Sequence, residues 1–167
     1  MNRYSTMFAA LVAASALHAQ TPAAELKGFY TGIKNNMMKA AEKMPEEDYS
    51  FKASPDVRTF GALIAHVADV QARTCAGIGG ATAPPSAGTK TAKADLVAAL
   101  KTSFDLCDGV ISSLSDEDAT KTVSLGRGGA RTRLGALWGT MAHSDEEYGY
   151  LAVYMRLKGI VPPSSEH

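Results

Sequence analysis

The chain has 167 residues, of which 46% are hydrophobic and 20% charged. This composition fits one globular domain with a sizeable core. Basic and acidic residues number 17 each, so the formal net charge is zero. Because no basic stripe is visible, nucleic acid is not an expected partner. Seven methionines and few aromatic residues favour helical packing over a β-sandwich.

The first twenty residues have the pattern of a secretory signal peptide. Arg3 provides a short positive region, and residues 7–17 form an apolar segment that is too short to span a bilayer. Ala14-Ser-Ala16 or Leu17-His-Ala19 provides a cleavage site with small residues at its key positions. The alternative is an amphipathic helix that is buried or frayed. We expect residues 1–20 to be removed and the chain to be periplasmic or secreted, with no stable membrane span after cleavage.

Two helices are predicted in the first half of the remaining domain, residues 21–167. Thr21 with Pro22 is a plausible helix start, and apolar residues recur at helical spacing as far as Met44. The second helix starts near Thr59 and ends in the glycine-rich segment 77–80. The following segment, 79–90, is rich in glycine, alanine, proline and threonine, and is predicted to be a long mobile loop.

Two more helices are predicted in the second half. The third has Thr91 as its cap and an apolar face that continues to Leu114. Residues 115–118 resemble a single capped turn, and residues 122–125 a short strand. The glycine-rich loop 126–132 leads to the cap of the fourth helix, which ends at Gly159 before two prolines. The loop 126–132 lacks the Lys-Ser/Thr pair of a phosphate-binding loop, so we expect it to be a simple connection.

Four amphipathic helices of similar length predict an all-α fold, a four-helix bundle with long connections. Each connection is longer than a tight helix hairpin requires. The sequence therefore does not impose an up-down-up-down order, and crossover connections are allowed.

Three residues could form a metal site. His143 and Glu147 lie four apart on the fourth helix, one turn above the other, and His66 is the remaining internal histidine. Two imidazoles and a carboxylate can chelate one divalent ion. Each residue also has a plain interpretation: histidines are often partly buried with one hydrogen bond, and acidic runs are usually exposed. Helical geometry places Asp69 and Tyr154 near these three residues, but neither can be named as a general base.

From Leu26 to Pro163 the chain resembles the DinB superfamily of four-helix-bundle metalloproteins. The resemblance lies in the second-helix segment 59–68, in 132–137, in Met141-Ala-His143 with Tyr148-Gly149, and in the tail 154–163. It implies a divalent metal bound by one histidine of the second helix and two, spaced His-x-x-x-His, on the last. His66 matches the first position and His143 the second. Glu147 stands at the third, a departure from the family pattern.

The resemblance also implies a function. Some DinB-like branches are thiol-dependent transferases and isomerases, but the signal peptide argues against a cytoplasmic thiol cofactor. We therefore expect an exported enzyme that uses zinc, nickel, iron or manganese, with an activated water or a thiol, on an unknown small-molecule substrate. The alternative is a binding or structural module that has lost tight metal binding. A homodimer through exposed helix faces is left open.

The only cysteines are Cys75, near the end of the second helix, and Cys107, on the apolar face of the third. An oxidising compartment would permit a disulfide. Both residues lie in helical apolar settings, and pairing requires Cα atoms within about 7 Å. We therefore expect two buried free thiols that pack as small hydrophobic side chains.

Overall fold

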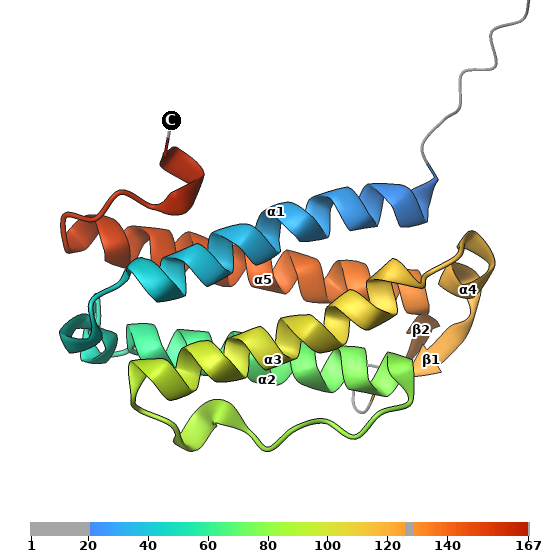
Figure 1. The fold of residues 1–167 in the computed structure, drawn as a ribbon, viewed down its shortest axis with the longest axis horizontal. Coiled ribbons are helices and arrows are strands. Elements are labelled where there is room, and N and C mark those ends of the chain that lie inside the picture. The colour runs from blue at the N-terminus through green and yellow to red at the C-terminus, as the bar shows by residue number, and fades with distance from the viewer. Residues whose placement is uncertain (1–20, 126–128, 167) are drawn as a thin grey trace, which may run out of the picture.

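A computed structural model describes residues 21–125 and 129–166. The predicted signal peptide and the glycine-rich residues 126–128 lie outside these ranges. Four long helices dominate the fold, and the predicted all-α bundle is confirmed (Figure 1). They are α1 (Pro22–Lys43), α2 (Phe60–Gly79), α3 (Lys93–Ser112) and α5 (Arg133–Leu157).

Side-chain caps determine where three of these helices begin. The hydroxyls of Thr21, Thr59 and Thr132 each accept a hydrogen bond from a backbone N–H of the first turn, which satisfies one of the donors left unpaired there. The predicted starts of these three helices are confirmed. The predicted cap at Thr91 is wrong, because α3 begins one residue later, after Ala92, and has no side-chain cap.

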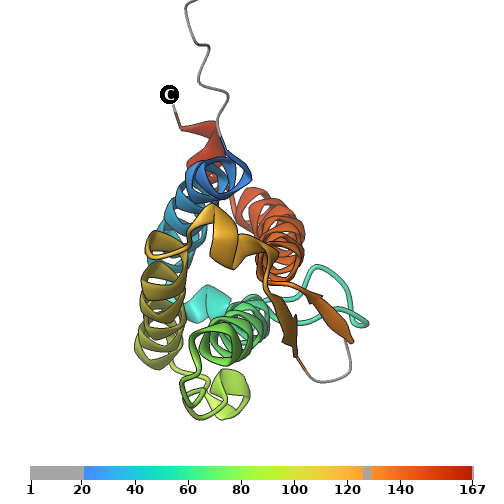
Figure 2. The same cartoon turned by 90° about the vertical axis from the view of Figure 1, so that its right-hand side faces the viewer.

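The helices form a ring in which α1 contacts α3 and α5, and α2 contacts the same two helices (Figure 2). Lys93, at the start of α3, donates to backbone carbonyls at the end of α1, and Lys27 of α1 donates to the carbonyls of Ser112 and Leu114. The helices α1 and α3 are therefore antiparallel. Figure 1 shows that α2 and α3 run in the same direction, so the bundle is not up-down-up-down.

Parallel neighbours require a connection that returns along the whole bundle. Residues 80–92 provide it, passing along the outside of α2 and α3 and containing the short 3₁₀ helix η2 (Ala87–Thr89) (Figure 1). The carboxylate of Asp69 on α2 accepts hydrogen bonds from the Ser86 hydroxyl, at 2.5 Å, and from the Ala87 N–H, at 2.7 Å. The predicted loop is therefore tied to the bundle at one point.

Short elements fill the remaining connections. The 3₁₀ helix η1 (Glu46–Ser50) follows α1, α4 (Asp116–Thr120) is the predicted capped turn, and η4 (Pro163–Ser165) ends the chain. The predicted strand is present as β1 (Thr122–Ser124). It pairs antiparallel with β2 (Ala130–Thr132), so the prediction that residues 126–132 form only a loop is wrong for their last three positions.

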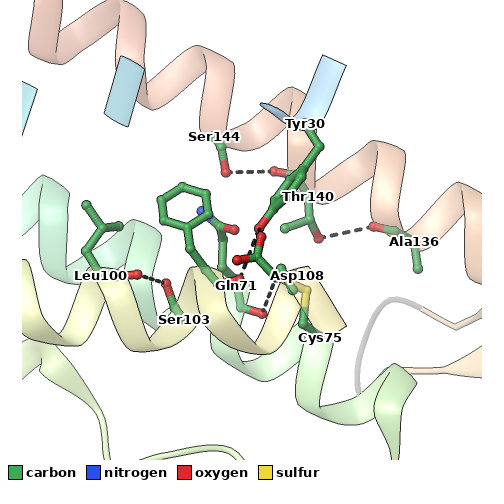
Figure 3. Close-up of a disulfide and its surroundings, with 11 residues drawn as sticks. Tyr30, Gln71, Cys75, Leu100, Ser103, Asp108, Ala136, Thr140 and Ser144 are labelled. Carbon is green, nitrogen blue, oxygen red and sulfur yellow. Dashed lines mark hydrogen bonds between the residues drawn. A yellow bond between two sulfur atoms is a disulfide. The ribbon is translucent and has the colours of Figure 1, made fainter. Parts of the chain in front are cut away.

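The core contains a disulfide. Cys75 of α2 and Cys107 of α3 are bonded, with Cα atoms 5.1 Å apart, and both are fully buried (Figure 3). The expectation of two free thiols is therefore wrong. Both cysteines do lie in buried apolar settings, as predicted, but α2 and α3 pack side by side, and this packing brings the sulfur atoms together.

A band of buried polar side chains lies near this disulfide. Ser103, Thr140 and Ser144 donate to carbonyls of their own helices (Figure 3), which satisfies their hydroxyls without a partner from another helix. Gln71 is fully buried, and its side-chain amide has no hydrogen-bond partner among the described residues.

In the described ranges, no helix is both long enough and apolar enough to cross a membrane.

Candidate metal site

The structure brings together the three side chains that the sequence singled out. The Nε2 atoms of His66, on α2, and His143, on α5, are 3.0 Å apart. The Oε1 atom of Glu147 lies 3.6 Å from the first of these nitrogens and 3.5 Å from the second. Three potential ligand atoms from two antiparallel helices therefore form a nearly equilateral triangle.

Helix geometry explains how α5 supplies two of the three ligand atoms. Residues four apart stack on one face, and this face of α5 packs against α2. Burial separates Glu147 from the acidic run that contains it: Asp145 and Glu146 are exposed, whereas Glu147 is only 5% exposed. The plain interpretation, a solvated acidic face, therefore fails at the one position that faces α2.

The protein environment shifts the pKa of two members of the triad. Burial, followed by the positive charge of Arg58, lowers the pKa of His66. Burial raises the pKa of Glu147, although His143 and Arg58 oppose that shift. A neutral imidazole is the form that binds a metal ion, whereas a buried carboxylate without a full positive partner favours its protonated form. A divalent cation would reverse that cost at Glu147.

The distances allow a direct test of whether a metal ion fits. Zinc–ligand bonds of about 2.0–2.1 Å in a tetrahedral site place neighbouring ligand atoms about 3.3 Å apart. The three observed separations, 3.0, 3.5 and 3.6 Å, bracket that value. Two neutral imidazole nitrogens at 3.0 Å must either share one proton or face a common cation, because two N–H groups would repel.

Two further atoms of the triad lack partners. Oε2 of Glu147 and Nδ1 of His143 are buried and accept or donate no hydrogen bond within the described parts of the chain. Buried polar atoms normally find a partner. An unpaired carboxylate oxygen next to two imidazoles fits a cation-binding role. The bare Nδ1 means that no described residue orients the His143 ring from behind, as such partners do in many metal sites.

The two residues that helical geometry placed nearby, Asp69 and Tyr154, have other partners. The Asp69 carboxylate accepts hydrogen bonds from Ser86 and Ala87 in the crossover connection, residues 80–92. The Tyr154 hydroxyl donates to the backbone carbonyl of Arg58 at 2.8 Å. Neither is directed at the triad as a general base.

Two surface cavities flank the triad and meet at one residue. The first, about 470 Å³, is lined by His66, and the second, about 910 Å³, is lined by Glu147. Arg58 lines both. Sequence reasoning did not identify this arginine. The available signal was its position directly before Thr59, the N-cap of the helix that carries His66.

Comparison with known proteins agrees with this architecture. A DinB-like protein from Bacillus cereus is similar in structure, with a TM-score of 0.68, 18% sequence identity, and coverage of 83% of this chain and 93% of the other. A DinB-like protein from Bacillus subtilis gives a TM-score of 0.66 at 22% identity, with coverage of 81% and 92%. These likenesses show the fold. No curated protein matches the sequence significantly.

The sequence itself matches the family model described as the DinB superfamily over residues 30–151. The match spans most of the chain and includes all three members of the triad. The four-helix bundle, its solved structural relatives and this match agree, and the chain belongs to the DinB superfamily.

Proposed function

We propose that this chain is an exported, divalent-metal-dependent enzyme that binds its metal through His66, His143 and Glu147. The observation that carries the proposal is the triangle of three ligand atoms, with sides of 3.0–3.6 Å, across two helices. The burial of Glu147 supports it, because an unpaired carboxylate is costly in such a place unless a cation accompanies it.

Each ligand residue has a distinct part. The two histidines are neutral donors supplied by facing helices, so binding would hold α2 and α5 together. Among the three ligands, only Glu147 carries a negative charge, so the three ligands and a divalent ion together would have a net charge of +1. When bound there, such an ion supplies Lewis acidity and lowers the pKa of a water or thiol at an open position.

Export is supported by the disulfide. Disulfides persist in oxidising compartments and are rare in the cytosol, and the Cys75–Cys107 bond agrees with the pattern of residues 1–20. An exported member would lack access to cytoplasmic thiol cofactors. This favours an activated water over a thiol as the nucleophile on the small-molecule substrate.

Metal analysis and thermal melting test the proposal. The purified protein should contain about one ion per chain, and a chelator should lower its Tm, because an ion that binds only the folded state stabilises it by mass action. Absence of metal, with no change of Tm on adding zinc, would instead support a binding or structural module that has lost the metal.

Variants at Glu147 test the third ligand. Glu147→Ala should weaken zinc binding by at least tenfold, since one of three protein donors is lost. Glu147→His should retain binding and shift preference towards nickel or zinc. Glu146→Ala is the matched control, because Glu146 is the adjacent but exposed carboxylate. Equal zinc affinities in isothermal titration across all four proteins would remove Glu147 from the site.

A further inference from the structure

The inference concerns the substrate and rests on the proposed function. Arg58 is the one arginine that lines both cavities beside the triad. Within the described ranges, its guanidinium makes no hydrogen bond and no ion pair, and only its backbone carbonyl is engaged, by Tyr154. Arginines near carboxylates usually pair with them, so an unpaired guanidinium at this place is available to a ligand.

The backbone at Arg58 is anchored from the helix that carries the metal ligands. Tyr154 lies seven residues after Glu147, two turns further along the same face of α5, and its hydroxyl binds the Arg58 carbonyl. The next residue, Thr59, caps α2 through its hydroxyl. Two contacts therefore hold the arginine's main chain between α2 and α5, while its side chain is exposed.

The charges around the cavities favour an anion. In the first cavity Lys90 adds a second cation, and the carboxylate of Asp69 is already engaged by the crossover. In the second cavity Lys52 and Arg58 stand against Asp56 and Glu147. A divalent ion at the triad would leave both cavities positive, and a positively lined cleft concentrates anionic ligands.

The second cavity also has an apolar wall. Val57, Leu63, Val153 and the ring of Tyr150 contribute to it. Val57, Val153 and Tyr150 are 40%, 51% and 48% exposed. Large apolar side chains that gather at a cleft and stay open to solvent are typical of a binding surface. The wall adjoins Arg58 and Glu147, so an apolar group and an anionic group would bind side by side.

We propose that the substrate is a small organic anion, with a carboxylate or a similar planar anionic group held by Arg58 and an apolar carbon portion seated against Val57, Leu63 and Val153. The guanidinium presents paired donors to such a group, which gives orientation as well as attraction. The bound molecule then lies across the mouth of the second cavity, next to Glu147.

Anion binding to the protein loaded with cobalt(II) tests this inference, with the visible absorption of cobalt as the readout. Benzoate is the probe, benzamide is its uncharged counterpart, and acetate lacks the apolar ring. Benzoate should bind most tightly. Arg58→Ala should weaken benzoate binding by about tenfold or more, as expected for loss of a charge-assisted hydrogen bond. The Kd of Arg58→Lys for benzoate should lie between those of the wild type and Arg58→Ala.

Arg73→Ala is the matched control. Arg73 is exposed and acts electrostatically on His66, as Arg58 does, but it lines neither cavity. Its removal should change the Kd for benzoate by less than about twofold, as expected for a screened surface charge. If Arg58→Ala and Arg73→Ala have equal effects, or benzamide binds as tightly as benzoate, the inference is overturned while the metal site stands. If no cobalt absorption develops at all, the proposed function itself fails.

Discussion

Glu147 is a carboxylate that the fold buries next to two imidazoles without giving its second oxygen a partner. Burial raises its pKa above the ordinary value of 4.5. A carboxyl group whose pKa is raised in the folded state destabilises the fold when it is charged, and this cost disappears as the pH falls through the folded pKa and below the unfolded one. Without metal, the negative charge at this position therefore opposes folding at neutral pH.

The replacement Glu147→Gln tests this cost. The variant keeps the shape and removes the charge, so the metal-free variant should melt a few degrees higher than the wild type at pH 7. The difference should shrink towards pH 4, where the wild-type carboxyl is itself protonated. In excess zinc the order should reverse, because only the carboxylate binds the ion well. Calorimetry at both pH values, with and without zinc, measures all three effects. A metal-free variant that melts no higher at pH 7 would contradict the prediction.

At the same scale, the sequence predicted which residues meet but not how each one is buried. The four-residue spacing of His143 and Glu147 follows from helix geometry alone. The different burial of Glu146 and Glu147 depends on which side of α5 faces α2, which is a property of the packed bundle. Arg58 was missed for the same reason, since its place between two cavities depends on how residues 51–58 lead into the start of α2.

At the scale of elements, α2 and α3 are cross-linked by the disulfide. The two cysteines are 32 residues apart in sequence, and a cross-link that closes a loop of this length stabilises a protein by about 2–4 kcal/mol, chiefly by restricting the unfolded chain. Replacing both Cys75 and Cys107 by alanine should lower the free energy of unfolding by about 2–4 kcal/mol and the Tm by several degrees.

Denaturant unfolding with and without reductant measures the disulfide's contribution. The reduced wild type should resemble the double variant, and reductant should not change the double variant, which serves as the control. Thiol labelling of the unfolded protein should find no reactive thiol before reduction and two afterwards. Two labelled thiols before reduction would show that the cysteines are free.

The helix ends were more predictable than the partners of the helices. The caps at Thr21, Thr59 and Thr132 depend on hydrogen bonds within one turn, so local sequence is enough. Thr91 offered the same signal, yet α3 begins after Ala92, at the point where Lys93 reaches the end of α1. Likewise β2 has no apolar alternation of its own, and it forms because β1 lies beside it.

For the whole molecule, the count and class of helices followed from periodicity, whereas their order in the bundle did not. Long connections allowed several topologies, and only packing selects the one in which α2 and α3 are parallel neighbours. The disulfide prediction failed at this scale. Each cysteine was placed correctly in an apolar helical setting, but the distance between them depends on which helices are adjacent, which neither stretch of sequence records.

The crossover and the disulfide together form a closed covalent ring. Residues 80–92 leave α2 after Cys75 and enter α3 before Cys107, so the chain between the two cysteines is held at both ends. A protease that cuts residues 80–92 would therefore not release either half of the protein.

A specific cleavage sequence inserted between the exposed residues Thr82 and Ala83 tests this. The cut protein should migrate as one species on a denaturing gel without reductant and as two with it. The same insertion in Cys75→Ala should give two species in both cases. The link between α2 and α3 is thus duplicated, by the backbone and by the disulfide, so this surface segment can accept a break without covalent separation of the two helices.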